Sequence, residues 1–377
     1  MPSRAVGEAV SQVLDSMGEE PPDLVVCFAS ADHVGAFEDI APAIRSTLRP
    51  GVLIGCTAMG VIGGAQEVEH GPALSLFAAR LPETRLEPAR FETASTPDGT
   101  AIVGWPELPD ETLDEHPEGP SALLMLADPF SFPADVFLDR VNTDIPGLPV
   151  IGGLASSANR PGGNRLVLDD LVTDNGAVAV ALTGGVDVKT VVSQGCRPVG
   201  SPYVVTKSEE NLIYELGGRP ALERLQFAAA AASADERDLM RRGLHIGRVV
   251  DEHRAEFTRG DFLVRTVMGG DQASGAIAVN DVVEVGQTVQ FHVRDASSAD
   301  EDLRSLLAGT TAGGVLLFTC NGRGTHMFNT PNHDASVVDD LLGPLPVAGL
   351  FCAGELGPVG SRSFLHGFTA SLALFQG

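Results

Sequence analysis

Two segments near the end of the chain carry side chains suited to binding a small charged molecule. Arg323 lies between Gly322 and Gly324, and Glu355 follows Gly354 in a second glycine-rich segment. A guanidinium presents a fixed set of donors that matches a carboxylate, and flanking glycines allow a ligand close to the backbone. Glu355 could accept an ammonium group, so the pair would suit both ends of a zwitterionic amino acid. Alternatively, Arg323 and Glu355 pair with each other and only hold neighbouring loops in place.

A second kind of chemistry would use thiols. The five cysteines form neither a CxxC pair nor a zinc-ligand spacing. Cys320 is close in sequence to Arg323 and His326, whose charges could lower the pKa of its thiol and make it a nucleophile or a redox-active group. Cys56 and Cys196 stand at the end of an apolar run or beside glycine and could line a ligand site. The alternative for all three is a packed, inert side chain, because free cysteine is among the most buried residue types.

An internal repeat predicts how these distant segments come together. An apolar strand, a loop, a segment with apolar residues at helical spacing and a second apolar strand occur three times, over residues 24–64, 122–159 and 314–358. Such alternation is common in α/β proteins, and duplication is favoured by the tripeptide Leu-Pro-Val, which recurs at 148–150 and 345–347. Strands joined by a helical crossover are normally parallel and right-handed. We therefore expect an α/β fold with mixed β-sheets flanked by helices, whose repeated units meet at one ligand cleft.

The loops that follow the strands are the predicted ligand contacts, because α/β sheets bind ligands beyond the carboxyl ends of their strands. The polar loop at 156–159 could orient a ligand, although its residue types are equally typical of a surface turn. Asp334 is predicted to cap the helix of the third copy. The predicted ligand-binding residues are Cys56, Thr57, Ser156, Ser157, Asn159, Cys196, Cys320, Gly322, Arg323, Gly324, Gly354 and Glu355.

The segment between the second and third copies has a different pattern. Pro220 is predicted to open one long alanine-rich helix that ends at about Arg242. Short β-type runs separated by turn residues follow and predict an antiparallel meander. We place the domain boundary near Gly217-Gly218, which divides the chain into an N-terminal domain of residues 1–217 and a C-terminal domain of residues 218–377.

The composition argues against several classes of partner. The 377 residues include 25 basic and 50 acidic side chains, which gives a net charge of −25 and a pI near 4.6. Nucleic acids and anionic membranes bind basic surfaces, so neither is an expected partner. No apolar run approaches the ~18 residues of a membrane-spanning helix, and the first residues lack the pattern of a secretory signal. Together with an odd, scattered set of cysteines, these features predict a cytoplasmic protein.

Four segments resemble, in order, the motifs of the FIST family. The segment IGCTAMGVIGG at 54–64 resembles the opening motif of its N-terminal domain, and QGCRPVG at 194–200 resembles the end of that domain. CNGRG at 320–324 and VAGLFCAGELGP at 347–358 resemble the two strongest motifs of its C-terminal domain. The resemblance implies a bacterial sensory or signal-transduction protein that binds a small ligand, with amino acids proposed. Because no kinase, cyclase or F-box segment is recognisable, its output is expected to pass to a separate signalling protein.

The resemblance leaves two other functions open. Some members are similar to haem-containing nitric-oxide sensors, and a haem needs an axial side chain in an apolar pocket. His326 and His366 lie nearest to the motifs, but no spacing marks either as an axial ligand, so the cofactor is left unknown and no metal site is expected. A thiol-dependent hydrolase or transferase that uses Cys320 is the other alternative. A non-catalytic, ligand-binding sensor is the preferred hypothesis.

Overall fold

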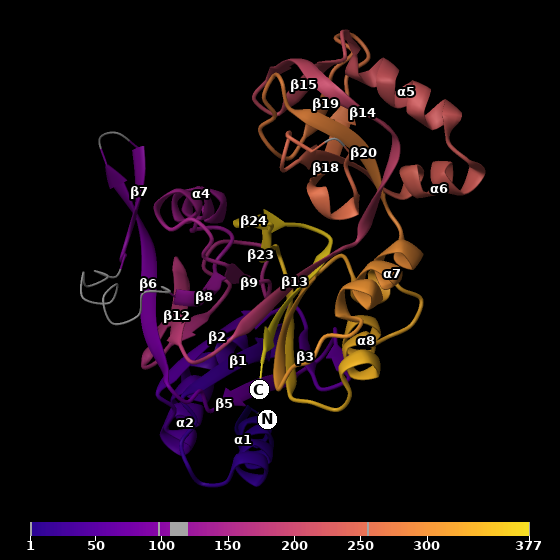
Figure 1. Ribbon diagram of the computed structural model, residues 1–377. Helices are drawn as coiled ribbons and strands as arrows, with labels where there is room; N and C mark the ends of the chain where they lie inside the picture. The colour runs from indigo at the N-terminus through magenta and orange to yellow at the C-terminus, as the bar shows by residue number, and fades with distance from the viewer. Residues whose placement is uncertain (1, 97–98, 106–119, 255, 377) are drawn as a thin grey trace. The chain divides into compact units, whose positions relative to one another are not determined.

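The chain divides into two compact units (Figure 1). The computed structural model describes residues 2–96, 99–105, 120–254 and 256–376. The units follow contacts in space, whereas the boundary near residue 217 concerns sequence domains and stays a prediction. Unit 1 consists of Met1–Val192, Arg304–Leu365 and Thr369–Gly377, and unit 2 consists of Ser193–Leu303 and His366–Phe368.

Unit 1 contains the three predicted strand–helix–strand copies. In each copy the two strands are hydrogen-bonded, parallel neighbours, as the helical crossover predicts. The first copy is β1 (Leu24–Ser30), α2 (Phe37–Leu48) and β2 (Val52–Ala58). The second is β8 (Pro120–Ala127), α4 (Ala134–Asp144) and β9 (Val150–Leu154), and the third is β21 (Gly314–Cys320), α8 (His333–Leu342) and β22 (Val347–Cys352).

Antiparallel neighbours extend each parallel pair into a mixed sheet, which confirms the predicted fold class. The first sheet has the order β11 (Leu171–Thr173), β10 (Leu166–Leu168), β2, β1 and β5 (Leu74–Ala79). The second has the order β24 (Arg362–His366), β23 (Glu355–Val359), β9, β8, β12 (Ala177–Gly184), β6 (Thr84–Thr96) and β7 (Gly99–Val103). The third has the order β13 (Val188–Gln194), β25 (Thr369–Phe375), β21, β22, β3 (Val61–Gly63) and β4 (Gln66–Val68).

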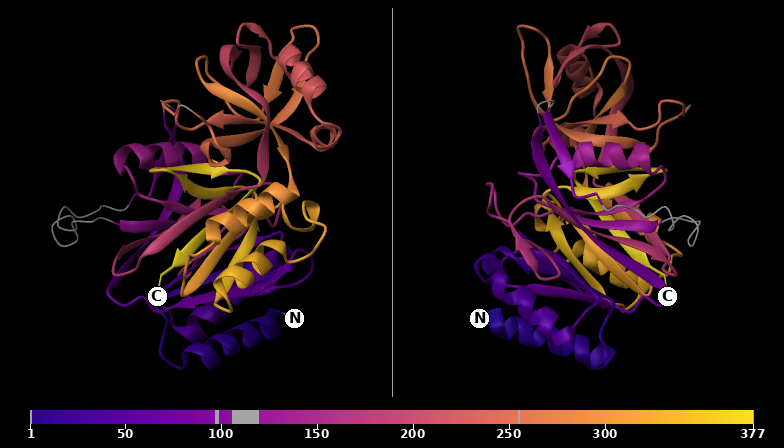
Figure 2. Two further views of the ribbon diagram at one scale, coloured as in Figure 1. Left: turned by 45° about the vertical axis from the view of Figure 1, so that its right-hand side comes forward. Right: turned by 90° about the vertical axis from the view of Figure 1, so that its left-hand side faces the viewer.

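The central strands are buried on both faces, which explains why they are continuous apolar runs in the sequence. Phe28 and its alternate neighbours in β1 face a core shared with the other sheets, where Phe28 meets Phe318 of β21 edge to face at 6.1 Å. The intervening side chains of β1, including Val25, pack against α1 (Pro2–Met17) and α2. The two indigo helices lie together against the strands β1, β2 and β5 in Figures 1 and 2.

A glycine in the second strand of each copy permits close contact with the first strand. A Cβ atom at Gly349 would overlap the carbonyl oxygen of Leu317, and one at Gly55 would overlap that of Cys27. A Cβ atom at Gly152 would likewise overlap a carbonyl oxygen of β8. The same constraint at equivalent places in three parallel pairs supports duplication of one unit.

We expect the Gly349→Ala substitution to lower the free energy of unfolding of unit 1 by about 1–3 kcal/mol, because the added methyl forces β22 away from β21. Urea unfolding followed by the fluorescence of Trp105, the single tryptophan of the chain, measures the loss in unit 1. Gly7→Ala in α1 is the matched control, since no described atom lies within 4 Å of the added Cβ. That variant should be unchanged or gain up to about 1 kcal/mol from the better helix propensity of alanine. Equal stabilities of the two variants would contradict the packing argument.

Unit 2 is built around antiparallel strands, as the short β-type runs predict. Because β14 pairs with both β20 and β15, the strands β14, β20, β17, β18, β19 and β15 form a closed ring. Phe291 of β20 and Ile246 of β17 lie in its apolar core. The strands are β14 (Cys196–Glu209), β15 (Leu212–Leu216), β16 (Arg219–Pro220), β17 (Leu244–Val249), β18 (Phe262–Gly270), β19 (Ile277–Val279) and β20 (Thr288–Arg294), followed by helix α7 (Ala296–Leu307).

The single long helix predicted from Pro220 to Arg242 is wrong, because the chain forms two helices there. These are α5 (Ala221–Ala231) and α6 (Ala234–Arg242). Ser233 begins the second helix with a capping box: its hydroxyl accepts the backbone N–H of Glu236, whose carboxylate accepts the N–H of Ser233. The alanine-rich composition is equally compatible with one helix or two, and the capping box at Ser233 is what starts a second helix. Within the described part of the chain, the helices lack the combination of length and apolar character needed to span a bilayer.

Candidate functional site

The two predicted binding segments lie next to each other at the carboxyl ends of adjacent parallel strands. Cys320 and Cys352, the last residues of β21 and β22, are register partners, and the N–H of Asn321 donates to the carbonyl oxygen of Cys352 at 2.9 Å. Arg323 and Glu355 follow these strands, and both side chains are fully buried. The Arg323 charge acts on the Glu355 carboxyl and opposes the rise of its pKa. The topology therefore brings the guanidinium and the carboxylate into one buried region.

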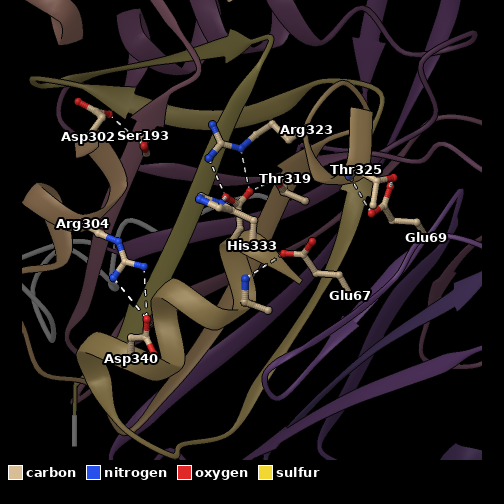
Figure 3. Close-up of polar contacts among 12 residues, drawn as sticks. Glu67, Glu69, Ser193, Asp302, Arg304, Thr319, Arg323, Thr325, His333 and Asp340 are labelled. Atoms are coloured by element: carbon tan, nitrogen blue, oxygen red, sulfur yellow. Dashed lines mark hydrogen bonds and ion pairs between the residues drawn. The ribbon is translucent and has the colours of Figure 1, made fainter. Parts of the chain in front are cut away.

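Arg323 forms its ion pair with Asp334 in the first turn of α8, not with Glu355. Its Nε and Nη2 atoms donate to the two carboxylate oxygens of Asp334 at 2.8 and 2.7 Å, and neither side chain is more than 1% exposed. The hydroxyl of Thr319 also donates to the Asp334 carboxylate, at 2.6 Å. Nδ1 of His333 lies 2.9 Å from Oδ1 of the same carboxylate (Figure 3). Burial tends to raise the pKa of Asp334, but the neighbouring guanidinium outweighs burial and holds that pKa well below its usual range.

The capping role expected for Asp334 is therefore wrong. Helix α8 begins at His333 with Asn332 at the N-cap, where the backbone is left-handed with a φ of 63°. Asp334 turns into the interior instead, because the buried guanidinium needs a partner. The alternative in which Arg323 pairs with Glu355 also named the wrong partner.

Two glutamates from a distant hairpin complete the surroundings of Arg323. Both carboxylate oxygens of Glu69, just after β4, accept from Thr325, one from its N–H at 2.9 Å and one from its hydroxyl at 2.7 Å. Glu67 of β4 accepts the N–H of Ala335 at 2.9 Å (Figure 3). Burial, followed by the charge of Asp334, raises the pKa of Glu67 to about 7. The β3–β4 hairpin thus ties the loop after β21 to the start of α8.

Glu355 lies in a different polar environment, at the start of β23. One of its carboxylate oxygens, Oε2, accepts the hydroxyl of Thr369 at 2.8 Å and the N–H of the same residue at 3.2 Å. Burial raises the pKa of Glu355 to about 8, although Thr369, Arg323 and a hydrogen bond with the Cys320 thiol act in the opposite direction. At neutral pH this carboxyl is therefore mostly protonated.

Three buried polar atoms of these loops have no hydrogen-bond partner among the described residues. They are Nη1 of Arg323, Oε1 of Glu355 and Oδ1 of Asn321. Buried polar atoms are normally paired, and an unpaired one costs the free energy of removing it from water. Nη1 of Arg323 thus remains available as a donor and Oδ1 of Asn321 as an acceptor, and Oε1 of Glu355 is an acceptor when the carboxyl is charged.

The loops after the second strands of the first two copies join the same end of unit 1. The hydroxyl oxygens of Thr57, near the end of β2, and Ser157, after β9, are 2.7 Å apart. The hydroxyl of Ser156 accepts the N–H of Met59 at 2.9 Å and donates to the carbonyl oxygen of Phe351 in β22. The ends of β2, β9 and β22 therefore meet, as the repeat predicts.

Sequence reasoning selected Asn159 in this region, whereas the buried amide belongs to Asn164. Asn159 is exposed, and Asn164 is fully buried. Asn164 accepts the hydroxyl of Ser157 at 2.8 Å and donates to Asp128 at the same distance. Asp128 directly follows β8, and a polar residue at the end of an apolar strand is the sequence pattern that would have predicted Asp128 as part of the site.

Comparison with known proteins decides the family. The FIST N domain matches residues 23–219, and the FIST C domain matches residues 221–358. The chain belongs to the FIST family. FIST domains are associated with sensory and signal-transduction functions. The resemblance of the four sequence motifs is thereby confirmed.

Uncharacterized mycobacterial proteins match this FIST protein over almost their full length. One from Mycobacterium tuberculosis is 44% identical over 379 residues, which cover 99% of this chain and 96% of the relative. One from Mycobacterium bovis is 43% identical over 379 residues, which cover 99% of this chain and 95% of the relative.

Both FIST domains contribute to the region around Arg323. The glutamates Glu67 and Glu69 belong to the FIST N match, whereas Arg323 and its partner Asp334 belong to the FIST C match. Strand β3 of the first pairs with β22 of the second within one sheet. Neither family domain alone therefore builds this site.

The predicted thiols of the FIST protein fall into two groups. Cys320 is half-buried at the end of β21, and Cys56 is fully buried in the core of unit 1. Burial, and then Glu355, Cys56 and Cys320 in that order, raise the pKa of Cys352 far above its ordinary value, so these groups are neighbours. Cys196 belongs to β14 of unit 2, and its place in a shared site stays a prediction.

The remaining candidates are two histidines. His326 is exposed, and His366 is buried and grouped with unit 2. Among the described residues, no group of three or more histidine, cysteine, aspartate or glutamate side chains is arranged to hold a metal ion. A cavity of about 430 Å³ in unit 1 lies between α1 and strands β3 and β5, and its lining includes none of the predicted ligand-binding residues.

Proposed function

We propose that this FIST protein is a cytoplasmic sensor that binds an amino acid or a related small acid at the loops after β21 and β22. The observation that carries the proposal is the set of unpaired atoms Arg323 Nη1, Glu355 Oε1 and Asn321 Oδ1. The donor suits the carboxylate of a ligand, and the two acceptors suit its ammonium group. Ligands commonly satisfy a few convergent polar groups of this kind.

The ion pair with Asp334 supports this assignment, because it holds the guanidinium in one orientation. Two of the three guanidinium nitrogens of Arg323, Nε and Nη2, donate to Asp334, and Nη1 remains for a ligand. A group fixed before binding loses less conformational entropy when the ligand arrives. Ligand contacts would order the loops at this end of unit 1, and a separate signalling protein would recognise the altered surface.

The proposal predicts that an amino acid binds more tightly as the pH rises. An ammonium group requires the charged form of Glu355, whose pKa is raised to about 8. The charged fraction increases from about one tenth at pH 7 to about nine tenths at pH 9, so the affinity should rise roughly tenfold. Titration calorimetry at both pH values against a panel of amino acids and small carboxylic acids measures the change. Failure of the whole panel to bind would reject the proposal.

Glu355→Gln should weaken binding of an amino acid at least about tenfold at pH 8, because the neutral amide cannot neutralise the ammonium group. The amide oxygen can still accept from Thr369, so the melting temperature should change little. Glu8→Gln on the exposed face of α1 is the matched control and should bind as the parent does. Unchanged affinity in Glu355→Gln would reject this carboxyl as a ligand contact.

A further inference from the structure

Two thiols at the carboxyl ends of β21 and β22 are placed to react with each other. Cys320 and Cys352 are register partners on adjacent parallel strands, so their side chains emerge on the same face of the sheet. Neighbouring strands are about 4.8 Å apart, and Cα atoms about 4.4–6.8 Å apart can be joined by a disulfide. All five cysteines of the chain are described by the structure and are present as thiols.

The two thiols differ in access to solvent. Cys320 is half-buried, whereas Cys352 is fully buried in the apolar core that also contains Cys56. A small solute can therefore reach Cys320 first. Cys352 can react only with a group that is already inside the protein, such as an oxidised Cys320.

A base and a positive charge lie beside the accessible thiol. The Glu355 carboxyl is hydrogen-bonded to Cys320, and it carries the unpaired Oε1 atom. Burial raises the pKa of Glu355 to about 8, and a carboxylate whose pKa is raised in this way is a stronger base for a neighbouring thiol. The Arg323 guanidinium interacts electrostatically with Cys320 and favours the thiolate.

We propose that Cys320 is a hydroperoxide-reactive thiol and that Cys352 resolves its oxidised form as a disulfide. The Glu355 carboxylate accepts the thiol proton, and the Cys320 sulfur attacks the outer oxygen of the hydroperoxide. The O–O bond breaks, the leaving alkoxide or hydroxide takes the proton from Glu355, and a sulfenic acid forms. The sulfur of Cys352 then attacks that of Cys320, which releases water and forms the S–S bond.

The disulfide would change the loops that follow both strands. A disulfide holds its two Cβ atoms about 3.5–4.5 Å apart, so it would fix the ends of β21 and β22 to each other. Arg323 and Glu355 follow these ends, so the disulfide would restrain the loops that carry them. The thiol reaction itself does not depend on the amino-acid ligand proposed above.

The test treats the full-length protein with a few equivalents of hydrogen peroxide or cumene hydroperoxide. Alkylation of the remaining thiols and non-reducing peptide mapping should find a Cys320–Cys352 disulfide and a mass loss of about 2 Da. In Cys352→Ala, dimedone should trap a sulfenic acid at Cys320. In Cys320→Ser, the peroxide should produce no disulfide that involves Cys352. Cys27→Ser, which alters a buried thiol in another part of unit 1, is the control and should still form the disulfide.

Three results would overturn the proposal: no reaction of Cys320 with either peroxide, a disulfide of Cys320 with Cys56, or only irreversible oxidation of Cys320 in the parent protein. If the cysteine variants fail to fold, the parent protein still decides between the two partners of Cys320. If the parent protein forms the disulfide but binds no amino acid, only the proposed ligand is rejected. If it binds an amino acid but forms no disulfide, only the thiol chemistry is rejected.

Discussion

Asp334→Ala is expected to lower the free energy of unfolding of unit 1 by about 3–5 kcal/mol, because it leaves the buried charge of Arg323 without a partner. The guanidinium is fully buried, and both of its hydrogen bonds to a carboxylate end on Asp334. Thr319 and His333 lose the same acceptor. The protein must then bury an uncompensated charge or open the loop to water.

A second ion pair made by the same helix provides the control. Arg304 and Asp340 of α8 are joined at 3.3 Å, but their side chains are 41% and 58% exposed (Figure 3). An exposed pair contributes about 0–1 kcal/mol, so Asp340→Ala should change stability little. Urea unfolding followed by Trp105 fluorescence compares both variants in unit 1. If Asp334→Ala and Asp340→Ala lower the free energy of unfolding equally, burial does not make the Arg323–Asp334 pair more important for stability than the exposed pair.

The double variant Arg323→Met with Asp334→Asn separates charge from packing. The amide keeps an acceptor for Thr319 and His333, and methionine fills much of the volume of the arginine side chain. Stability should recover by at least half of the loss in Asp334→Ala, because no unpaired charge remains. A double variant as unstable as the single one would contradict this explanation.

The placement of the loops could be predicted from the sequence because it follows from local patterns. Continuous apolar runs such as 24–29 and 315–319 predict buried strands, and helical spacing between two strands predicts a parallel pair. Parallel strands end at the same edge of a sheet, so the loops with Arg323 and Glu355 had to be close. The helix break at Ser233 was also readable, since Glu236 stands three residues later.

The partners of Arg323 could not be predicted in this way. Asp334 satisfies the local rule for a helix cap, and only the buried guanidinium turns it inward. Glu69 is 256 residues away from Thr325 in the sequence, and nothing near either residue indicates their contact. Local rules describe neighbours along the chain, whereas a buried charge selects its partner from the whole fold.

The second large effect concerns pH. Unit 2 should lose stability as the pH falls from about 6.5 to about 4, because two neutral histidines are buried as a pair. His245 of β17 and His292 of β20 are register partners and are 3% and 0% exposed. Both ring nitrogens of His245 and Nε2 of His292 have no partner among the described residues. The His245 ring packs against Phe368 at 4.4 Å, and the His292 ring against Phe262 at 4.8 Å.

The pKa of both rings is lowered to about 4, chiefly by burial, and for His245 the charges of Arg294 and His292 contribute to that value. The unfolded chain binds these protons near pH 6.5, whereas the folded unit resists them until about pH 4. Between about pH 6.5 and about pH 4, proton binding therefore favours the unfolded state and lowers the stability of unit 2. Above about pH 6.5 these two rings do not change the stability with pH. Each histidine should remove on the order of 3 kcal/mol over the full interval.

Hydrogen exchange measured by mass spectrometry on peptides of β17 and β20, corrected for intrinsic rates, reports the opening of unit 2 at pH 7 and pH 5. His245→Leu should reduce the pH-dependent loss by about half, because only one proton site remains. The same variant should be at least as stable as the parent at pH 7, since it removes unpaired ring nitrogens from the interior. His253→Ala, which alters an exposed histidine of unit 2, should keep the full pH dependence. If the amide protection of β17 and β20 in the parent protein stays constant from pH 7 to pH 5, both rings bind protons equally well in the folded and unfolded states. Burial would then not lower their pKa values, and the prediction would be wrong.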